Sequence, residues 1–366
     1  MKPQVRYWLR HLSAHIDLPL LGIVLALMAI GLVTIYSATA SEGLARFDNQ
    51  IINMTAALAV MLGVAQTPPQ TLMRLAVPLY ALGIVLLLGV FFFGVSVNGS
   101  RRWLSLGITR IQPSELMKIA MPLMLAWFFH KRESELRIHH FAIAAVLLLV
   151  PTLLILKQPD LGTSMLVGAT GFFVIFFAGL PWKILLGLAG AGAAALPLAW
   201  QFVLHDYQRR RVLTLIDPGS DPLGAGYHII QSTIAIGSGG PWGKGWLKGT
   251  QTHLDFIPEK HTDFIFAVFS EEWGIAGNCV LLLLFACLIL RGLRIAASAP
   301  TLFSRLLASA VSLVFFIYAF VNMGMVSGIL PVVGVPLPFI SYGGTALVTL
   351  MLGVGILMSI RTHRPH

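Results

Sequence analysis

Apolar residues in this sequence come in blocks of about 20, the length at which a helix spans the roughly 30 Å hydrocarbon core of a bilayer. This spacing constrains the fold more than any other feature. Of the 366 residues, 57% are hydrophobic and 11% are charged, whereas a soluble domain has about 25% charged residues. A soluble chain of this size cannot bury so much apolar surface, so a soluble enzyme and a disordered chain are both excluded. The sequence predicts a polytopic membrane protein.

The apolar blocks predict an all-α fold with about ten transmembrane helices, built as one membrane domain over residues 1–366. A long polar segment separates the seventh helix from the eighth, and we expect it to form a large extracytoplasmic loop. Such a long loop in a compact protein is usually functional or disordered, and its many aromatic and isoleucine residues argue against disorder. The predicted helices cover residues 18–37, 50–66, 75–95, 114–130, 141–157, 162–180, 182–204, 263–291, 303–329 and 340–360, and the loop covers 205–262.

Lysine and arginine residues in short loops predict the orientation of the chain in the membrane. Basic clusters precede the first helix, follow the fourth, separate the eighth from the ninth and follow the tenth, so both termini are expected in the cytoplasm. One loop contradicts this rule, because Arg101, Arg102 and Arg110 would lie outside; either the other loops outweigh it or it binds an anion. Topology and anionic lipid headgroups explain the net charge of +10, so nucleic acid is not an expected partner.

Two further segments have an unusual composition. Residues 328–344 are apolar but contain three prolines, so we expect a re-entrant or bundle-capping segment there. The glycine-rich stretch 237–249 resembles a phosphate-binding P-loop. However, Ser238 replaces a required glycine, and Gly245 follows Lys244 where the motif needs Ser or Thr. Nucleotide-driven chemistry is therefore not expected.

Charged residues within or beside the predicted helices are functional candidates, because an unpaired charge in a bilayer is costly. Glu115 and Lys118 are three residues apart in the fourth helix, so they share a face and can pair. Asp160 lies in a polar break at the outer ends of the fifth and sixth helices, and Glu271 and Glu272 lie inside the eighth. Either Glu115, Lys118 and Asp160 form a network that fixes helix packing, or they contribute directly to a reaction.

Asp263 stands at the junction of the 205–262 loop and the eighth helix, beside Glu259, Lys260 and His261. It has two candidate roles: it can cap the helix by accepting free N–H groups, or it can act in catalysis, which the polar groups around it favour. A helix N-terminus would lower its pKa. The loop also carries basic residues that suit a pyrophosphate or anionic headgroups, namely Arg209, Arg210, Arg211, Lys244 and Lys248.

Several long motifs follow one another along the chain in a fixed order. They are Arg102-Trp103 with Gln112-Pro113-Ser114-Glu115, Gln158-Pro159-Asp160-Leu161-Gly162-Thr163, Asp221 to Tyr227, Gly237-Ser238-Gly239-Gly240 with Gly243-Lys244-Gly245, Pro258 to Phe266, and Pro336 with Ser341-Tyr342-Gly343-Gly344. With these motifs the whole chain resembles the SEDS family (shape, elongation, division and sporulation). The form of residues 226–232 and the short N-terminus resemble its elongation branch more than its division branch.

This resemblance implies a peptidoglycan glycosyltransferase that polymerises lipid II on the outer face of the bacterial cytoplasmic (inner) membrane. It also implies a ten-helix fold and a class B penicillin-binding protein, a transpeptidase, as the partner. The other expected ligands are lipid II, the undecaprenyl pyrophosphate-linked glycan and membrane lipid. The essential loop aspartate of the family corresponds to Asp263, and its paired membrane charges correspond to Glu115, Lys118 and Asp160.

A β-1,4 product requires inversion at the donor anomeric carbon, hence one displacement without a covalent enzyme intermediate. Such a reaction needs a base for the acceptor hydroxyl and positive charge on the leaving pyrophosphate. We expect Asp263 to be the base; alternatively it holds a divalent cation, Mg²⁺ or Mn²⁺, and the sequence leaves both roles open. The expected substrate- and pyrophosphate-binding residues are Lys244, Arg209, Arg210, Arg211, Arg102 and His261.

Two functions from other classes compete with this one. A flippase for lipid-linked precursors would use Glu271, Glu272, Glu115 and Asp160 as a path, with key charges near the midplane and access from both sides. Because Asp160 and Asp263 lie at outer helix ends, the sequence favours chemistry at the surface. A non-catalytic scaffold of the wall-elongation complex would leave Asp263 replaceable, provided that partner binding survives.

Overall fold

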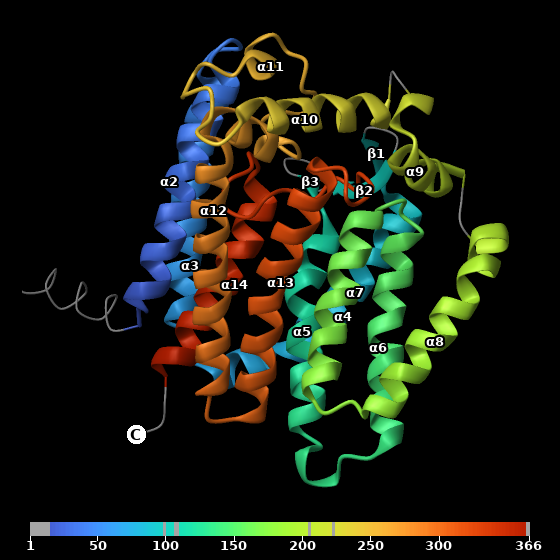
Figure 1. Ribbon diagram of the computed structural model, residues 1–366. Helices are drawn as coiled ribbons and strands as arrows, with labels where there is room; N and C mark the ends of the chain where they lie inside the picture. Colours follow the sequence, from blue (N-terminus) through green and yellow to red (C-terminus); the bar gives the residue numbers. More distant parts are fainter. Residues whose placement is uncertain (1–14, 98–99, 106–109, 204–205, 222–223, 364–366) are drawn as a thin grey trace, which may run out of the picture.

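In the computed structural model, which describes residues 15–97, 100–105, 110–203, 206–221 and 224–363, the apolar helices stand side by side in a bundle (Figure 1). This arrangement confirms the predicted helical, multi-pass membrane protein. In the described part of the chain, seven helices are long and apolar enough to cross a membrane: α2 (Leu18–Thr39), α3 (Ala45–Ala65), α4 (Pro69–Phe93), α6 (Ile138–Leu156), α12 (Ile265–Ala297), α13 (Leu302–Val326) and α14 (Gly344–Thr362).

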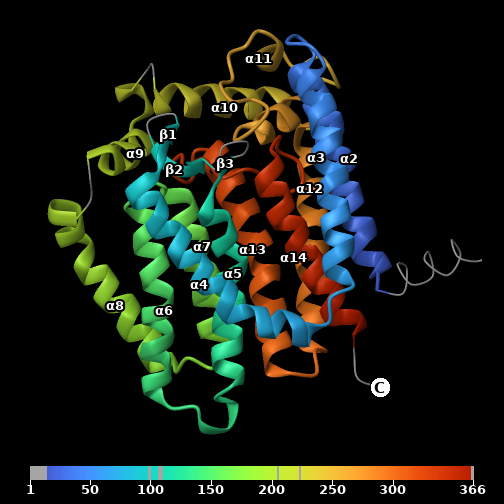
Figure 2. The same cartoon turned by 180° about the vertical axis from the view of Figure 1, so that it is seen from behind.

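Three shorter helices complete the bundle: α5 (Pro113–His130), α7 (Leu161–Phe177) and α8 (Trp182–Leu198). Most of α5 is buried although it carries Glu115 and Lys118. By contrast, α8 has no buried residue and leans away at the edge of the bundle (Figure 2). That these three helices also span the membrane, which would give ten spans in one domain, remains our prediction.

Helix ends differ from the hydropathy pattern by a few residues. Helix α3 begins at Ala45, earlier than predicted, because its first turn is polar and the hydropathy pattern does not reveal it. Helix α4 begins at Pro69, where proline suits a first helical turn. Helix α14 begins only at Gly344, and the preceding residues 331–343 form an irregular segment at the end of the bundle that α10 covers (Figure 1).

A small antiparallel sheet joins α4 to α5, where we had expected only a loop. Its strands are β1 (Val95–Val97), β2 (Ser100–Ser105) and β3 (Arg110–Ile111), in the order β1-β2-β3. The sheet packs against the end of α4, and it places Arg102 of β2 beside the start of α7. A short 3-10 turn, η1 (Glu133–Glu135), joins α5 to α6 at the other end of the bundle.

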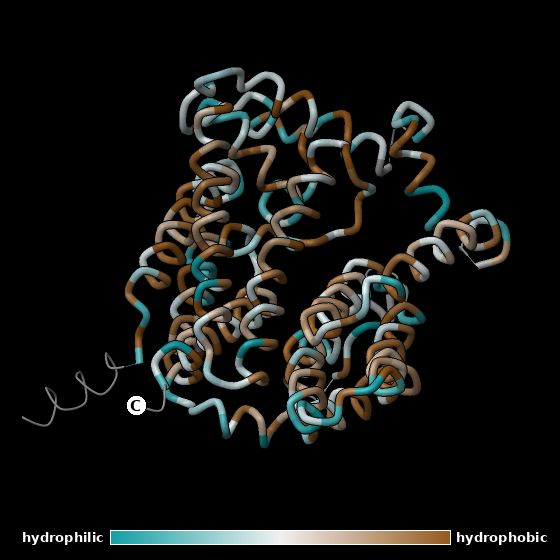
Figure 3. Tube along the Cα trace, turned by 60° about the horizontal axis from the view of Figure 1, so that its bottom comes forward, coloured by the Kyte–Doolittle hydropathy of each residue, from teal (hydrophilic) through white to brown (hydrophobic). Residues whose placement is uncertain are grey.

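The polar segment between α8 and α12 is folded. It contains the short π-helix η2 (Ala199–Val203), α9 (Asp206–Ile216), the 3-10 turn η3 (Pro218–Ser220), α10 (Ala225–Gly239) and α11 (Thr250–His253). Helix α10 lies across the ends of the bundle helices, with α9 near one of its ends and α11 near the other (Figures 1 and 2). Hydrophilic residues gather in this segment and in the connecting loops, whereas apolar residues follow the helices (Figure 3).

The two ends of the described chain meet at the side of the bundle opposite α10 (Figure 1). Asp17 caps α2 by accepting from the Leu20 N–H (3.0 Å) and also accepts from Arg291 Nε (3.0 Å). His15 Nδ1 lies 3.1 Å from Thr362 Oγ1. This arrangement agrees with both termini lying on the face opposite the polar segment.

Helix α12 is interrupted at Gly274, which has a φ of 62°, and residues 240–245 insert at this break. The inserted chain pairs with backbone groups that the interrupted helix leaves free. The hydrogen bonds are Ile275 N to Gly240 O (2.9 Å), Ala276 N to Pro241 O (3.0 Å), Lys244 N to Glu271 O (3.0 Å) and Gly245 N to Glu272 O (3.0 Å).

The glycine-rich stretch therefore has a structural purpose. A Cβ on Gly239 would lie 2.2 Å from the carbonyl oxygen of Ser270, and one on Gly243 would lie 2.1 Å from that of Glu272. Only glycine allows the inserted chain to approach α12 this closely. These contacts give a physical account of a motif that resembles a phosphate-binding loop but lacks its key residues.

Candidate functional site

Asp263 lies at the end of the bundle that α10 covers, just before α12, whose N-cap position is Phe264. No described residue donates a hydrogen bond to the Asp263 carboxylate, and the helix has no side-chain cap. Asp263 is therefore not a helix cap, so the simpler of its two predicted roles is wrong. Its carboxylate is partly buried, and its unused lone pairs can accept a proton or a hydrogen bond from a ligand.

The surroundings of Asp263 make its carboxyl group more basic. Burial, followed by repulsion from the Glu259 carboxylate, raises the pKa of Asp263 to about 6. This shift is opposite to the one expected from a helix N-terminus, because the carboxylate accepts no N–H bond from α12. Gly334 has a φ of 71°, and a Cβ there would lie 3.3 Å from Asp263 Oδ2. A pKa near neutrality suits a general base.

Two half-buried histidines lie around this turn. The His228 ring of α10 packs 5.3 Å from the ring of Phe264, and the His261 ring lies 5.9 Å from that of Tyr342. Burial is the main cause that lowers the pKa of both imidazoles, which favours their neutral form. A neutral imidazole both donates and accepts hydrogen bonds, which suits sugar hydroxyl groups.

Lys244, a predicted pyrophosphate ligand, is bound to the protein itself. Its Nζ lies 2.7 Å from Oε1 of Glu271, which is fully buried, and 2.8 Å from Thr250 Oγ1. Glu271 also accepts from the Gln251 N–H (2.9 Å), the Thr252 N–H (3.2 Å) and the Thr252 hydroxyl (2.9 Å). The main partner of Lys244 is thus a carboxylate that fixes α11 to α12.

The arginine cluster Arg209–Arg211 lies on α9, near the Ala225 end of α10 (Figure 1), whereas Lys244 follows the Gly239 end. Helix α10 has 15 residues, so it is about 22 Å long. One pyrophosphate therefore cannot contact both Lys244 and the arginine cluster. Arg209 donates to the Gln201 carbonyl (2.8 Å) and lies 3.9 Å from Asp206.

Two basic residues that we had not singled out as ligands lie closer to His261. Arg46, in the first turn of α3, forms an ion pair with Glu42, and its charge contributes to the lowered pKa of His261. Lys260 is buried, lying 3.2 Å from Glu42 and 2.5 Å from Asp255. The sequence did contain a signal for Arg46, because the predicted loop 38–49 also lies outside and its arginine opposes the positive-inside rule. We overlooked it and set only the loop with Arg101, Arg102 and Arg110 against that rule.

The predicted membrane charges connect helices. Lys118 Nζ lies 2.6 Å from Glu115 Oε1 and 5.3 Å from the centre of the Tyr318 ring. Glu115 Oε2 also accepts from the Thr349 hydroxyl (3.1 Å). The pair therefore links α5 with α13 and α14. These contacts support a packing role, which remains a prediction.

Asp160 connects three elements: β2, the start of α5 and the start of α7. It caps α7 by accepting from the Thr163 N–H (3.1 Å), and it accepts from Gln112 Nε2 (3.1 Å) just before α5. Arg102 of β2 lies 3.7 Å from Asp160 and donates to the Pro159 carbonyl (2.9 Å). Arg102 is partly exposed and thus retains surface toward solvent.

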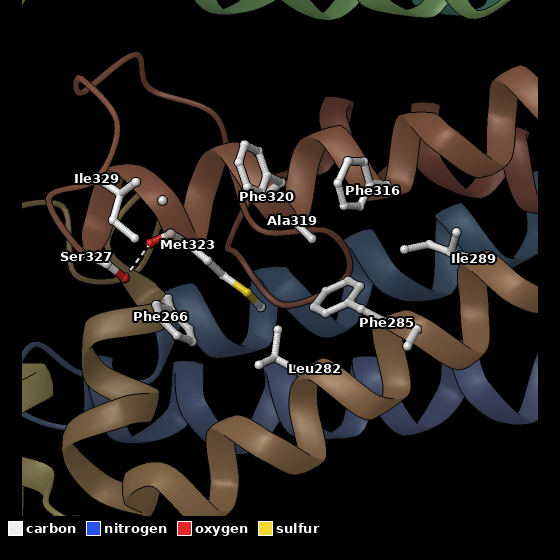
Figure 4. A pocket seen from close by; sticks show the side chains of 12 residues that line it. Phe266, Leu282, Phe285, Ile289, Phe316, Ala319, Phe320, Met323, Ser327 and Ile329 are labelled. Atoms are coloured by element: carbon white, nitrogen blue, oxygen red, sulfur yellow. Dashed lines mark hydrogen bonds between the residues drawn. The ribbon is translucent and has the colours of Figure 1, made fainter.

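An apolar groove of about 440 Å³ lies between α12 and α13, on the side of the helices that Phe285 and Phe316 line (Figure 4). Phe266, Met323 and Ile329 form one end of it, at the left in Figure 4. No charged side chain lines it. It is therefore suited to apolar contacts and not to proton transfer or pyrophosphate binding.

The divalent-cation alternative finds few ligands. In the part of the chain that the structure describes, no three His, Cys, Asp or Glu side chains come together as a metal site. Asp263 and Glu259 are two carboxylates in one turn, and Mg²⁺ is commonly held by one or two carboxylates together with waters and substrate phosphates. The role of Asp263 as a ligand of a divalent cation therefore stays a prediction beside its role as the base, and we assign no step to a metal.

Comparison with known proteins places this site in a family. The model of cell cycle proteins of the FtsW, RodA and SpoVE type matches residues 18–366. "Peptidoglycan glycosyltransferase MrdB" of Escherichia coli K12 is 52% identical over 352 residues, which cover 96% of this chain and 95% of the relative.

Two solved structures share the fold. A chain from a peptidoglycan synthase complex, described as coordinating polymerization and crosslinking, has a TM-score of 0.83 at 35% identity, over 95% of this chain and 99% of that chain. The rod shape determining protein RodA of Thermus thermophilus has a TM-score of 0.71 at 31% identity, over 94% and 96% of the two chains. The chain therefore belongs to the FtsW, RodA and SpoVE family of cell cycle proteins, the SEDS family that its motifs resemble.

Proposed function

We propose that this chain, a peptidoglycan glycosyltransferase, polymerises lipid II into β-1,4-linked glycan strands at the outer face of the cytoplasmic membrane, with Asp263 as the general base. The near full-length match to a peptidoglycan glycosyltransferase supports the activity. The observation that supports the site is the Asp263 carboxylate: it is partly buried, has a pKa raised to about 6, and receives no hydrogen bond from described residues.

The reaction is a single displacement. The 4-hydroxyl oxygen of the acceptor GlcNAc forms a bond to C1 of the donor sugar, and the bond from C1 to the pyrophosphate oxygen breaks with its electron pair. Asp263 takes the hydroxyl proton as the bond forms. Attack from the face opposite the leaving group inverts C1. The donor arrives already activated as a lipid-linked pyrophosphate, so no nucleotide site is needed.

The separation of the basic groups suits two lipid-linked substrates. Donor and acceptor each carry a pyrophosphate, and their sugars hold the two phosphates apart. Arg209–Arg211 at one end of α10 and Lys244 at the other can each serve one of them, with Arg102 and His261 as further contacts. In this proposal Lys244 exchanges its contact with Thr250 for a substrate phosphate while keeping Glu271.

The proposed partner is a class B penicillin-binding protein whose transpeptidase crosslinks the strands. The likeness to a chain from a peptidoglycan synthase complex that couples polymerization to crosslinking supports this proposal. The proposed location is the inner membrane of a bacterium, with both termini in the cytoplasm and α9–α11 outside. The position of the chain ends opposite α10 supports this topology.

The test is lipid II polymerisation in liposomes containing the chain and its partner, whose transpeptidase is blocked by a β-lactam. Asp263→Asn is compared with wild type and with Asp217→Asn, an exposed aspartate of the same outer segment. We expect Asp263→Asn to lose at least about 100-fold in rate, and Asp217→Asn to match wild type.

The alternatives give different results. If Asp263→Asn polymerises as well as wild type, the site assignment is wrong, and a scaffold role gains support if partner binding survives. If neither wild type nor any variant makes glycan, and wild type carries labelled lipid II across the bilayer, the chain is a flippase. No described observation favours the flippase, because Glu271 and Asp160 are occupied by structural contacts.

A further inference from the structure

The main chain that carries Asp263 is held by a buried amide on another helix. Asn322 of α13 has no exposed surface, and its Nδ2 donates to the Asp263 carbonyl (2.8 Å) and to the Val335 carbonyl (2.7 Å). Both partners are carbonyl oxygens, which only accept, so the NH₂ group of Asn322 must face them. Asn322 thereby ties three separate segments together.

The two residues before Asp263 are held in the same way. The Ser341 hydroxyl donates to the Thr262 carbonyl (2.7 Å) and accepts from the Leu337 N–H (2.8 Å). The Tyr342 N–H donates to the His261 carbonyl (2.8 Å). Three successive carbonyl groups, those of residues 261, 262 and 263, therefore accept hydrogen bonds from the C-terminal third of the chain.

Helix α12 does not supply these bonds itself. Its first turn is closed by the Ala267 N–H, which donates to the Phe264 carbonyl (3.0 Å). The carbonyl groups of residues 261–263 lie before that turn and take their donors from Asn322, Ser341 and Tyr342. The direction of the Asp263 side chain thus depends on groups outside α12.

We propose that Asn322 and Ser341 are positioning residues of the glycosyl transfer, which clamp the carbonyl groups of Asp263 and Thr262 and so fix the direction from which the Asp263 carboxylate meets the acceptor hydroxyl. This inference rests on the proposed role of Asp263 as the base. A misplacement of about 1 Å in a reacting group can cost about 100-fold in rate. Loss of the clamp therefore slows the chemical step without weakening substrate binding.

Leucine at position 322 separates positioning from packing. It has the number and branching of the side-chain heavy atoms of asparagine, although its methyl groups are bulkier, and it suits a buried helix face but cannot donate to either carbonyl. It also removes Asn322 Oδ1, a buried acceptor without a donor among the described residues. If Asn322 only filled space between α13 and its neighbours, Asn322→Leu would retain activity.

The experiment measures kcat, KM and thermal unfolding for Asn322→Leu, Ser341→Ala and Asn278→Leu in the liposome polymerisation assay with the partner. Asn278 is the matched control, because its side chain accepts from Ser270 (3.0 Å) in the same helix bundle and does not contact the Asp263 turn. We expect Asn322→Leu to lower kcat by about 10–100-fold with KM within about twofold. Ser341→Ala should lower kcat by a smaller factor, and Asn278→Leu should leave it unchanged.

Any other outcome contradicts the proposal that Asn322 and Ser341 position Asp263. It is wrong if Asn322→Leu keeps wild-type kcat, if kcat falls only in proportion to the loss of folded protein, or if KM rises while kcat is retained. Should Asn322→Leu fail to fold, Ser341→Ala decides, and an unchanged kcat there refutes the proposal. Asp263→Asn in the same assay separates the two proposals: if it is active, the base assignment fails; if it is inactive while the clamp variants behave as wild type, only the clamp fails.

Discussion

Two groups of carboxylates lie near the start of α12, and they differ in how many hydrogen bonds the protein donates to them. Glu271 is fully buried and accepts from Lys244, from the hydroxyl of Thr252 and from the backbone of residues 251 and 252. Asp263, two turns earlier, accepts from no described residue. One carboxylate holds the fold, and the other remains open to a ligand.

The difference teaches how to judge charges in a membrane protein. Intramembrane carboxylates are functional candidates because they are costly, but this cost is offset when several donors surround the group. A carboxylate whose lone pairs are filled cannot take a proton from a substrate. Glu272 is intermediate: it accepts from Ser37 and from the Leu247 N–H (3.1 Å), while its Oε2 has no described partner.

Removal of Glu271 should give the largest effect on stability. Glu271→Ala leaves Lys244 and the N–H groups of residues 251 and 252 without their acceptor. Breaking a buried pair from one side costs about 3–5 kcal/mol, so we expect a clearly lower unfolding temperature in detergent. Lys244→Ala should cost less, because Glu271 keeps its backbone donors. Equal melting of Glu271→Ala and wild type would show that this carboxylate is not structural.

Replacement of Gly243 tests whether residues 240–245 pack against the break in α12. Gly243 has a φ of 79°, and a Cβ there would meet the Glu272 carbonyl oxygen at 2.1 Å. Gly243→Ala should therefore cost about 2–4 kcal/mol, from backbone strain and overpacking. Gly237→Ala is the control, because no atom lies within 4 Å of its Cβ position. Similar chemical denaturation of both variants would refute the insertion of residues 240–245.

The polymerisation rate should depend on pH through the ionisation of Asp263. The base must be ionised, and burial with the Glu259 charge raises the pKa of Asp263 to about 6. The polymerisation rate should thus be constant above neutrality and about tenfold lower at pH 5, one unit below that pKa. Glu259→Gln removes the like charge and should move the midpoint to lower pH. A rate that stays constant down to pH 4.5 would contradict this account.

The arginines of α9 should give the smallest effect. The triple variant Arg209→Ala, Arg210→Ala and Arg211→Ala removes charges from one end of α10. We expect KM for lipid II to rise about three- to tenfold, with kcat retained and with less difference at high salt, because the contact is partly exposed. Steady-state assays at two ionic strengths measure this. A large loss of kcat would instead place these arginines at the reacting pyrophosphate.

The helical fold and the position of Asp263 could be predicted from the sequence, because helix length and a polar junction are local signals. The irregular segment 328–344 was also foreseeable from its prolines. The engagement of Lys244 with Glu271 was not, since it depends on a contact between residues 27 positions apart. Nor was the break at Gly274, because the apolar pattern of α12 reads as one continuous helix.

The Asn322 contact was hidden for a similar reason. A single asparagine in an apolar helix gives no sign of its partner, and the Asp263 carbonyl lies 59 positions away along the chain. The raised pKa of Asp263 also depends on burial by distant segments such as Gly334. The sequence thus located the candidate base, whereas only the folded chain shows what holds it.

The unfolding temperatures of Asp263→Asn and Glu271→Gln, measured side by side with polymerisation, test the division between the two carboxylates most directly. An ionised Asp263 without donors destabilises the fold, and asparagine removes that cost. We predict that Asp263→Asn unfolds at or above the wild-type temperature while polymerisation is lost, and that Glu271→Gln unfolds several degrees lower. If Asp263→Asn lowers the unfolding temperature as much as Glu271→Gln does, then Asp263 is a structural residue and the central claim is wrong.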